Sequence, residues 1–146
     1  MALLSFLSSK EERLLINTIQ KAESQTSGEI RVHIEPGTPD ADPFQRALEI
    51  FARLEMHKTK QRNGVLFYIA TDTHKFAIVA DSGINRVVPE NFWEEIKDTM
   101  RTRFKQHQYL KGLEEGITQT GEYLKKYFPS SGYDTNELDD SISTSS

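Results

Sequence analysis

The sequence predicts an α/β domain whose central sheet is covered by helices on both faces. Residues 29–35 alternate strictly between apolar and polar side chains, which is typical of a strand. Residues 65–70 and 75–80 are two further apolar runs separated only by a short turn. Segments with the apolar spacing of helices lie before, between and after these strands. This alternation of helices and strands is typical of a layered α/β fold.

The composition narrows the class of protein. A chain of 146 residues has the length of one domain, and 36% hydrophobic with 27% charged residues is typical of soluble globular proteins. The formal net charge of −4 disfavours nucleic acid as a partner, because neutralising phosphates requires a basic surface. The absence of cysteine excludes disulfides and thiolate metal ligands. Because we see neither a signal-peptide pattern nor an apolar run of about 18 residues, we expect a cytoplasmic protein without a membrane span.

The first helix is expected to begin near Ser8, because Ser8 precedes Glu11 at the spacing of a capping box. It should end near Gly28, since glycine readily adopts the left-handed conformation that closes a helix. In the strand that follows, one face carries Ile30, Val32 and Ile34, and the other carries Arg31, His33 and Glu35. This pattern predicts a half-buried strand.

Asp42 followed by Pro43 is a favourable cap and first residue for a second helix. The nearly continuous apolar run that follows predicts a strand buried on both faces, paired in a hairpin with the next strand. The predicted later elements are the two strands of the 65–80 hairpin and two helices over 92–104 and 110–128. We expect one domain over residues 1–129. Residues 130–146 form an acidic tail rich in Ser and Thr, which we expect to be disordered or to lie along the surface.

The predicted topology gathers oxygen-bearing side chains at one end of the sheet. A β-α-β crossover makes the first two strands parallel, and the hairpin then reverses the third. Asp81, at the end of the third strand, should therefore lie near the starts of the other two, beside Glu29 and Asn63. With Asn85 these residues could ligate a hard divalent cation, most readily Ca²⁺, with Mg²⁺ as the alternative. In the competing interpretation Asp81 only forms the turn that ends its strand.

The basic loop ahead of Asn63 suggests a second kind of ligand. Lys60 and Arg62 could hold an anion, such as a phosphate, at the same end of the sheet, although such a run is more often solvated surface. The four histidines lack the spacing of a helical zinc pair, which argues against a zinc enzyme.

Several stretches together resemble a known family. They are TSGEIRVHI, MHKTKQRNGVLFYIA, KFAIVADSGI, VPENFWEEI and YLKGLEEGI, and they span most of residues 8–129. In this order they resemble the TPM domain family, the thylakoid-lumen-phosphatase-like domains, and the chain is identified as a stand-alone bacterial member. Asn63-Gly64 and the acidic strand end at Asp81 with Gly83 match the family pattern. The chain lacks the Leu-Glu pair that many members carry after that strand.

The resemblance implies an αβα sandwich around a mixed four-stranded sheet, one strand more than the pattern itself predicts. It also implies an acid phosphatase activity in plant members and divalent cation binding in some bacterial ones. We therefore expect a metal-modulated binding or regulatory module, in which loops 57–64 and 81–90 meet around a cation. The alternatives are a metal-assisted phosphatase acting on phosphate monoesters at the same end, and a scaffold that binds another protein.

Overall fold

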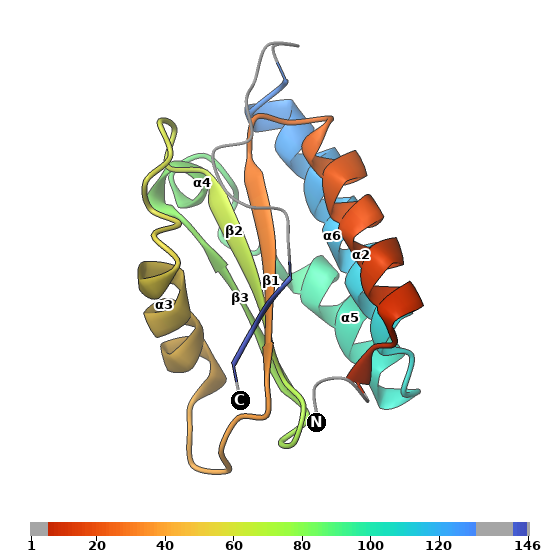
Figure 1. The fold of residues 1–146 in the computed structure, drawn as a ribbon. Helices are drawn as coiled ribbons and strands as arrows, with labels where there is room; N and C mark the ends of the chain where they lie inside the picture. Colours follow the sequence, from red (N-terminus) through yellow and green to blue (C-terminus); the bar gives the residue numbers. More distant parts are fainter. Residues whose placement is uncertain (1–5, 131–141, 146) are drawn as a thin grey trace.

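The computed structural model describes residues 6–130 and 142–145, which form a three-layer αβα sandwich (Figure 1). The elements in chain order are α2 (Ser9–Glu23), β1 (Glu29–Glu35), α3 (Pro43–Arg53), β2 (Gly64–Ala70), β3 (Lys75–Ala80), α4 (Ser82–Asn85), α5 (Glu94–Lys105), α6 (Tyr109–Tyr127) and β4 (Ser143–Thr144). Helix α3 covers one face of the sheet, and α2, α5 and α6 cover the other. The predicted fold class is confirmed.

The sheet is mixed, with the strand order β3-β2-β1-β4. Strand β1 pairs in parallel with β2, and Glu29 lies opposite Gly64. Strand β2 pairs antiparallel with β3, and Val65 lies opposite Ala80. Both the predicted crossover through α3 and the predicted hairpin are confirmed. The end of β3 therefore lies beside the start of β2 and at the same end of the sheet as the start of β1.

Side chains determine where the first two long helices begin. Ser8 accepts a hydrogen bond from the Glu11 N–H at 3.1 Å, and its own N–H donates to the Glu11 carboxylate at 2.9 Å. Asp42 accepts from the Phe44 N–H at 3.0 Å, ahead of Pro43 in the first turn of α3. Such caps satisfy N–H groups that have no partner within the helix. The capping box and the Asp-Pro start are both confirmed.

Two hydrophobic clusters lie on opposite faces of the sheet. Strand β2 supplies Val65, Phe67 and Ile69 to the cluster beneath α2, α5 and α6, and Leu66, Tyr68 and Ala70 to the cluster beneath α3. Every residue of β2 is buried, as its continuous apolar run predicts.

Strand β1 differs from its prediction, because its polar face is also buried. His33 and Glu35 are only 3% and 5% exposed. Arg46 of α3 contacts Glu35, and Ser143 contacts His33. Contacts from segments distant in sequence thus cover a face that its alternating pattern marks as solvent-exposed.

The fourth strand comes from the C-terminal tail rather than from the body of the domain. Ser143 and Thr144 pair in parallel with His33 and Ile34, and the Ser145 N–H donates to the Ile34 carbonyl at 3.1 Å. Within the tail, which is expected from the sequence to be disordered or to lie along the surface, these residues form a short strand at the edge of the sheet. The rest of the predicted tail between 131 and 141 lies outside the described residues.

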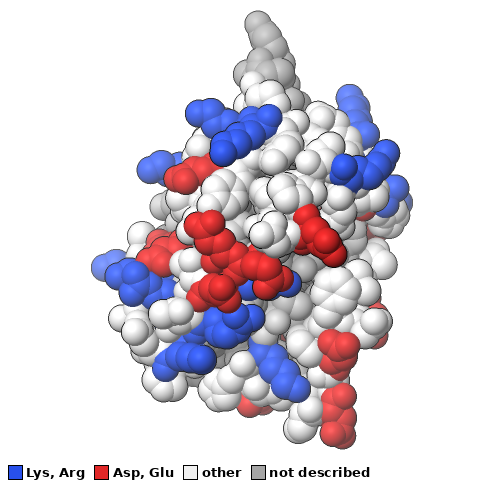
Figure 2. All heavy atoms as spheres, turned by 180° about the vertical axis from the view of Figure 1, so that it is seen from behind, with Lys and Arg blue, Asp and Glu red and all other residues white. Residues whose placement is uncertain are grey.

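The surface carries charges of both signs. On the face in Figure 2, acidic side chains gather near the middle, and basic ones lie above and below them. Along α5, Lys97 pairs with Glu94 and Arg101 pairs with Asp98, each three residues apart. Because both signs of charge are interspersed on this surface, a charged ligand would be attracted by a local group of side chains and not by one uniform electrostatic field. None of the helices in the described part of the chain combines the length and apolarity needed to cross a membrane.

Candidate functional site

The two loops expected to meet at the Asp81 end of the sheet are in direct contact. The Asp81 N–H donates to the Gly64 carbonyl at 3.0 Å, and the Gly83 N–H donates to the Arg62 carbonyl at 2.8 Å. A Cβ atom on Gly83 would lie 2.0 Å from the Gln61 carbonyl oxygen. Only glycine therefore allows the backbones of loops 57–64 and 81–90 to approach this closely.

Asp81 is buried at the junction of these loops and is paired with Arg62. Its carboxylate accepts both arms of the Arg62 guanidinium, at 2.8 and 2.9 Å, and the Ser82 N–H at 2.7 Å. The hydrogen bond and the charge of Asp81 raise the pKa of Arg62 further. The side chain of Asp81 is 6% exposed, whereas that of Arg62 is 47% exposed. The anion that Arg62 holds in this structure is therefore the carboxylate of Asp81.

Asn63 and Glu29 are also buried at this end of the sheet. Asn63 is 1% exposed, and its side-chain amide donates to the Ser27 hydroxyl at 3.2 Å. The Asn63 carbonyl accepts from the Glu29 N–H at 3.3 Å, and Glu29 is 3% exposed. Both residues lie at the same end of the sheet as Asp81, but β2 separates Glu29 from β3, and their contacts tie the start of β1 to the loop before β2.

Asn85 and Lys60 lie on the outer side of the junction. Asn85 ends α4, the short helix within loop 81–90, and its amide donates to the Ala80 carbonyl at 2.9 Å. The side chains of Asn85 and Lys60 are both exposed.

A cation at this junction would rely mainly on one carboxylate. Within residues 6–130 and 142–145, no three His, Cys, Asp or Glu side chains are grouped so that they could hold a metal ion. Of the predicted ligands at this junction, Asp81 supplies a carboxylate held at the contact between the two loops, and a hard cation there would have to draw its other ligands from neutral oxygens. These donors fit a cation only where Arg62 gives up its place on Asp81.

The structure also reveals a buried polar cluster that the sequence does not predict. Glu35 accepts both arms of Arg46, at 2.8 and 2.9 Å, and the hydroxyl of Tyr68. The His33 ring lies 3.3 Å from Glu35 through Nε2 and 2.8 Å from the Ser143 hydroxyl through Nδ1. The cluster joins α3, the centre of the sheet and β4. Polar residues two apart on one strand face were its only signal in the sequence.

The burial of this cluster shifts its ionisation. Burial alone would raise the pKa of Glu35, but the hydrogen bonds from Arg46 and Tyr68 lower it to about 2. Burial lowers the pKa of His33 below 6.5, and the neighbouring Glu35 offsets only part of that shift. Burial and Glu35 raise the pKa of Tyr68. At neutral pH the cluster therefore holds a carboxylate, a guanidinium, a phenol and a neutral imidazole.

Mild acid is expected to destabilise the protein through His33. Its pKa is lower in the folded chain than in the unfolded chain, so the unfolded state takes up a proton first as the pH falls below 6.5. The free energy of unfolding should therefore decrease between pH 7.5 and 5.5. In His33→Gln the decrease should be smaller, as urea unfolding at each pH can measure. Equal pH dependence in both proteins would contradict this role. The charged groups that act on the ring are Glu35, Arg46 and Arg53.

Comparison with known proteins places the chain in a family. The model of the TPM domain family matches residues 3–123, and the chain therefore belongs to this family. The solved structure of the BA42 protein from the psychrophilic bacterium Bizionia argentinensis has 42% sequence identity to this chain and a TM-score of 0.90, with 96% of each chain covered. The comparison with curated proteins gives no match.

Two more distant structures share the fold. The N-terminal domain of a P. gingivalis protein has 22% identity and a TM-score of 0.71, over 84% of this chain and 79% of its own. The N-terminal domain of the cg2496 protein from Corynebacterium glutamicum has 9% identity and a TM-score of 0.64, over 96% and 80% respectively. At these identities the likeness concerns the fold alone.

Proposed function

We propose that this TPM domain is a cation-responsive binding module in which Asp81 exchanges Arg62 for a divalent cation. One observation carries the proposal: a buried carboxylate is paired with a cationic side chain that is itself nearly half exposed. Asp81 is fixed by its backbone bond to Gly64 and by its cap on α4, whereas nearly half of the Arg62 side chain is in solvent. Arg62 can therefore swing away without opening the core.

The donor set favours Ca²⁺ over Mg²⁺. Calcium accepts irregular shells of carboxylate, amide and carbonyl oxygens, whereas magnesium requires near-octahedral geometry. Asp81 would be the central ligand and Asn85 the next, because Asn85 is exposed on the same loop and its backbone N–H bonds to the Asp81 carbonyl. Asn63 and Glu29 would join only if their buried contacts rearranged. A site with one principal carboxylate implies weak binding, with a Kd of about 10⁻⁴ to 10⁻³ M.

Exchange at Asp81 would change what the junction offers to other ligands. Once Arg62 left the carboxylate, its guanidinium would be available to an anion, together with the exposed Lys60 of the same loop. Cation and anion binding at this end of the sheet should then strengthen each other, because each favours the separated state of the ion pair. Cation binding would thus change loop 57–64, because it would release Arg62 from Asp81.

A calcium titration followed by calorimetry and amide NMR tests this exchange. In the wild-type protein, the amides of residues 57–64 and 81–90 should shift together. Asp81→Asn should abolish these shifts. Arg62→Gln should instead bind Ca²⁺ severalfold more tightly, because the competing cation is gone. Arg86→Gln is the matched control, since Arg86 lies on the same loop but donates to the Ser82 carbonyl at 3.3 Å.

Two outcomes would contradict the proposal. Calcium binding that is unchanged in Asp81→Asn would place the cation elsewhere, and weaker binding in Arg62→Gln would mean that Arg62 supports the site rather than competes for it. The phosphatase alternative predicts turnover of p-nitrophenyl phosphate that depends on Asp81 and Arg62 but not on Arg86. Such turnover would favour the enzyme over the binding module.

A further inference from the structure

One edge of the sheet is open at β3. In the order β3-β2-β1-β4, β3 is an outer strand, and no other strand of the described residues pairs with its far edge. The backbone N–H of Asp81 donates to Gly64 of β2, so every second residue of β3 counted back from Asp81 directs its backbone N–H and C=O groups toward β2. The residues between them, Phe76, Ile78 and Ala80, direct these groups outward. Asn85 covers the Ala80 carbonyl. The open stretch is therefore centred on Phe76 and Ile78, away from the Asp81 junction.

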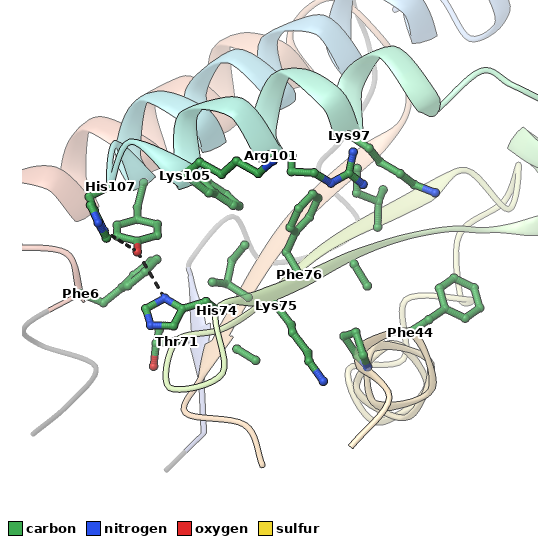
Figure 3. Close-up of a pocket in the computed structure, with 17 residues that line it drawn as sticks. Phe6, Phe44, Thr71, His74, Lys75, Phe76, Lys97, Arg101, Lys105 and His107 are labelled. Atoms are coloured by element: carbon green, nitrogen blue, oxygen red, sulfur yellow. Dashed lines mark hydrogen bonds between the residues drawn. The ribbon is translucent and has the colours of Figure 1, made fainter. Parts of the chain in front are cut away.

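A cleft of about 650 Å³ lies along this open stretch and reaches around both sides of the strand (Figure 3). On one side it is bounded by α5 and the aromatic rings packed beneath it. On the other side it is bounded by the start of α3, where Phe44 is 47% exposed. Phe76 and Ile78 point into the layer beneath α5, whereas Ala77 points toward α3. The cleft thus offers a separate surface on each face of the sheet.

The rim of the cleft is basic. Lys97, Arg101 and Lys105 project from successive turns of α5, and Lys75 extends from the start of β3 (Figure 3). No Asp or Glu belongs to the described residues that line the cleft. Glu94 and Asp98, which pair with Lys97 and Arg101, are more than half exposed and lie outside it. An anionic group that enters the cleft would meet several cations.

The floor beneath these cations is aromatic. The rings of Phe76 and Phe104 meet edge to face with centroids 5.2 Å apart, and the guanidinium of Arg101 lies 5.9 Å from the centre of the Phe76 ring. Phe104 in turn packs against Tyr109 at 5.6 Å. A side chain with an apolar stem and an anionic tip, such as glutamate, matches this arrangement of apolar floor and cationic rim.

We propose that this cleft binds an extended acidic peptide segment of a partner protein, which adds to β3 as a fifth strand. Outward backbone groups of Phe76 and Ile78 would pair with the peptide backbone. Because side chains of a strand alternate between faces, every second residue would carry its carboxylate to the cations of α5, and the others would place apolar groups against Phe44. A second copy of this chain is disfavoured, because pairing two β3 edges would bring two basic rims together.

We assign the occupant as a peptide because the cleft exposes both faces of β3 together with the unpaired backbone groups along its outer edge. A small amphiphile would use only the aromatic floor and the cations of α5. The site lies at the Lys75 half of β3, so its test is independent of the calcium proposal at Asp81.

The probe is the synthetic peptide acetyl-(Glu-Val)₃-amide, titrated into the ¹⁵N-labelled full chain. We expect amide shifts centred on residues 75–80 and on α5, and slowed hydrogen exchange at Phe76 and Ile78. The double variant Arg101→Glu with Lys105→Glu should weaken binding about tenfold or more. The control Lys10→Glu with Arg13→Glu makes the same charge change on exposed residues of α2 and should bind as the wild type does.

Three comparison ligands make the result decisive. A peptide with Lys in place of Glu should not bind, and a peptide N-methylated at its central residues should lose most of its affinity, because it cannot pair with the edge. Equal binding of the N-methylated peptide would show that charge alone is recognised and would overturn strand addition. Shifts from laurate at this cleft without shifts from the acidic peptide would assign it to small amphiphiles and would also overturn the proposal.

Discussion

Gly83→Ala is expected to lower the free energy of unfolding by about 3 kcal/mol, because the added methyl group has no room. Its Cβ would lie 2.0 Å from the Gln61 carbonyl oxygen and 2.6 Å from that of Arg62. Both atoms belong to the backbone, so no side-chain rotation can relieve the clash. Loops 57–64 and 81–90 would have to separate, with loss of the Gly83 N–H bond to Arg62.

Urea unfolding of Gly83→Ala beside Ser82→Ala measures this effect. Ser82 is exposed and adjacent, and its replacement should change the free energy of unfolding by less than about 0.5 kcal/mol. The amide spectrum of Gly83→Ala should change mainly at the two loops. A Gly83→Ala protein as stable as the wild type would mean that the loops part at little cost, and that their contact does not restrict the position of Asp81.

Glu35→Gln is expected to destabilise the protein by about 3 kcal/mol, because it leaves the guanidinium of Arg46 without its buried counter-charge. Glu49→Gln is a matched control, since Glu49 pairs with the same arginine at 3.2 Å but its side chain is 64% exposed. Removal of that exposed pair should cost about 1 kcal/mol or less. Equal losses in the two variants would contradict a dominant role for the buried pair.

The pH dependence of stability gives the Glu35 variant a second readout. The pKa of Glu35 is about 2 in the folded chain against 4.5 without the fold, so the unfolded state binds a proton first as the pH falls. The stabilisation from Glu35 is therefore complete above pH 4.5 and is lost toward pH 2. Glu35→Gln should lack this component, and its difference from the wild type should shrink as the pH is lowered through that window.

Local patterns in the sequence determined the elements and their order. The capping box at Ser8, the Asp42-Pro43 start and the apolar run of β2 each act over a few residues, so they are readable without the fold. Chain direction then placed Asp81 at the same end of the sheet as Asn63 and Glu29, because a crossover followed by a hairpin permits few arrangements. The family resemblance added the fourth strand but not its position in the tail.

Only the tertiary structure decided which charges are paired and which surfaces stay open. Arg62, expected to hold a ligand anion, holds Asp81, and Arg46 neutralises Glu35 from another layer of the sandwich. Ser143 reaches His33 across 110 positions of sequence. Ion pairs and burial depend on distances between segments far apart in the chain, whereas periodicity records only the preferences of neighbouring residues. The basic cleft at β3 has the same origin, since its walls come from a strand and from helices on both faces of the sheet.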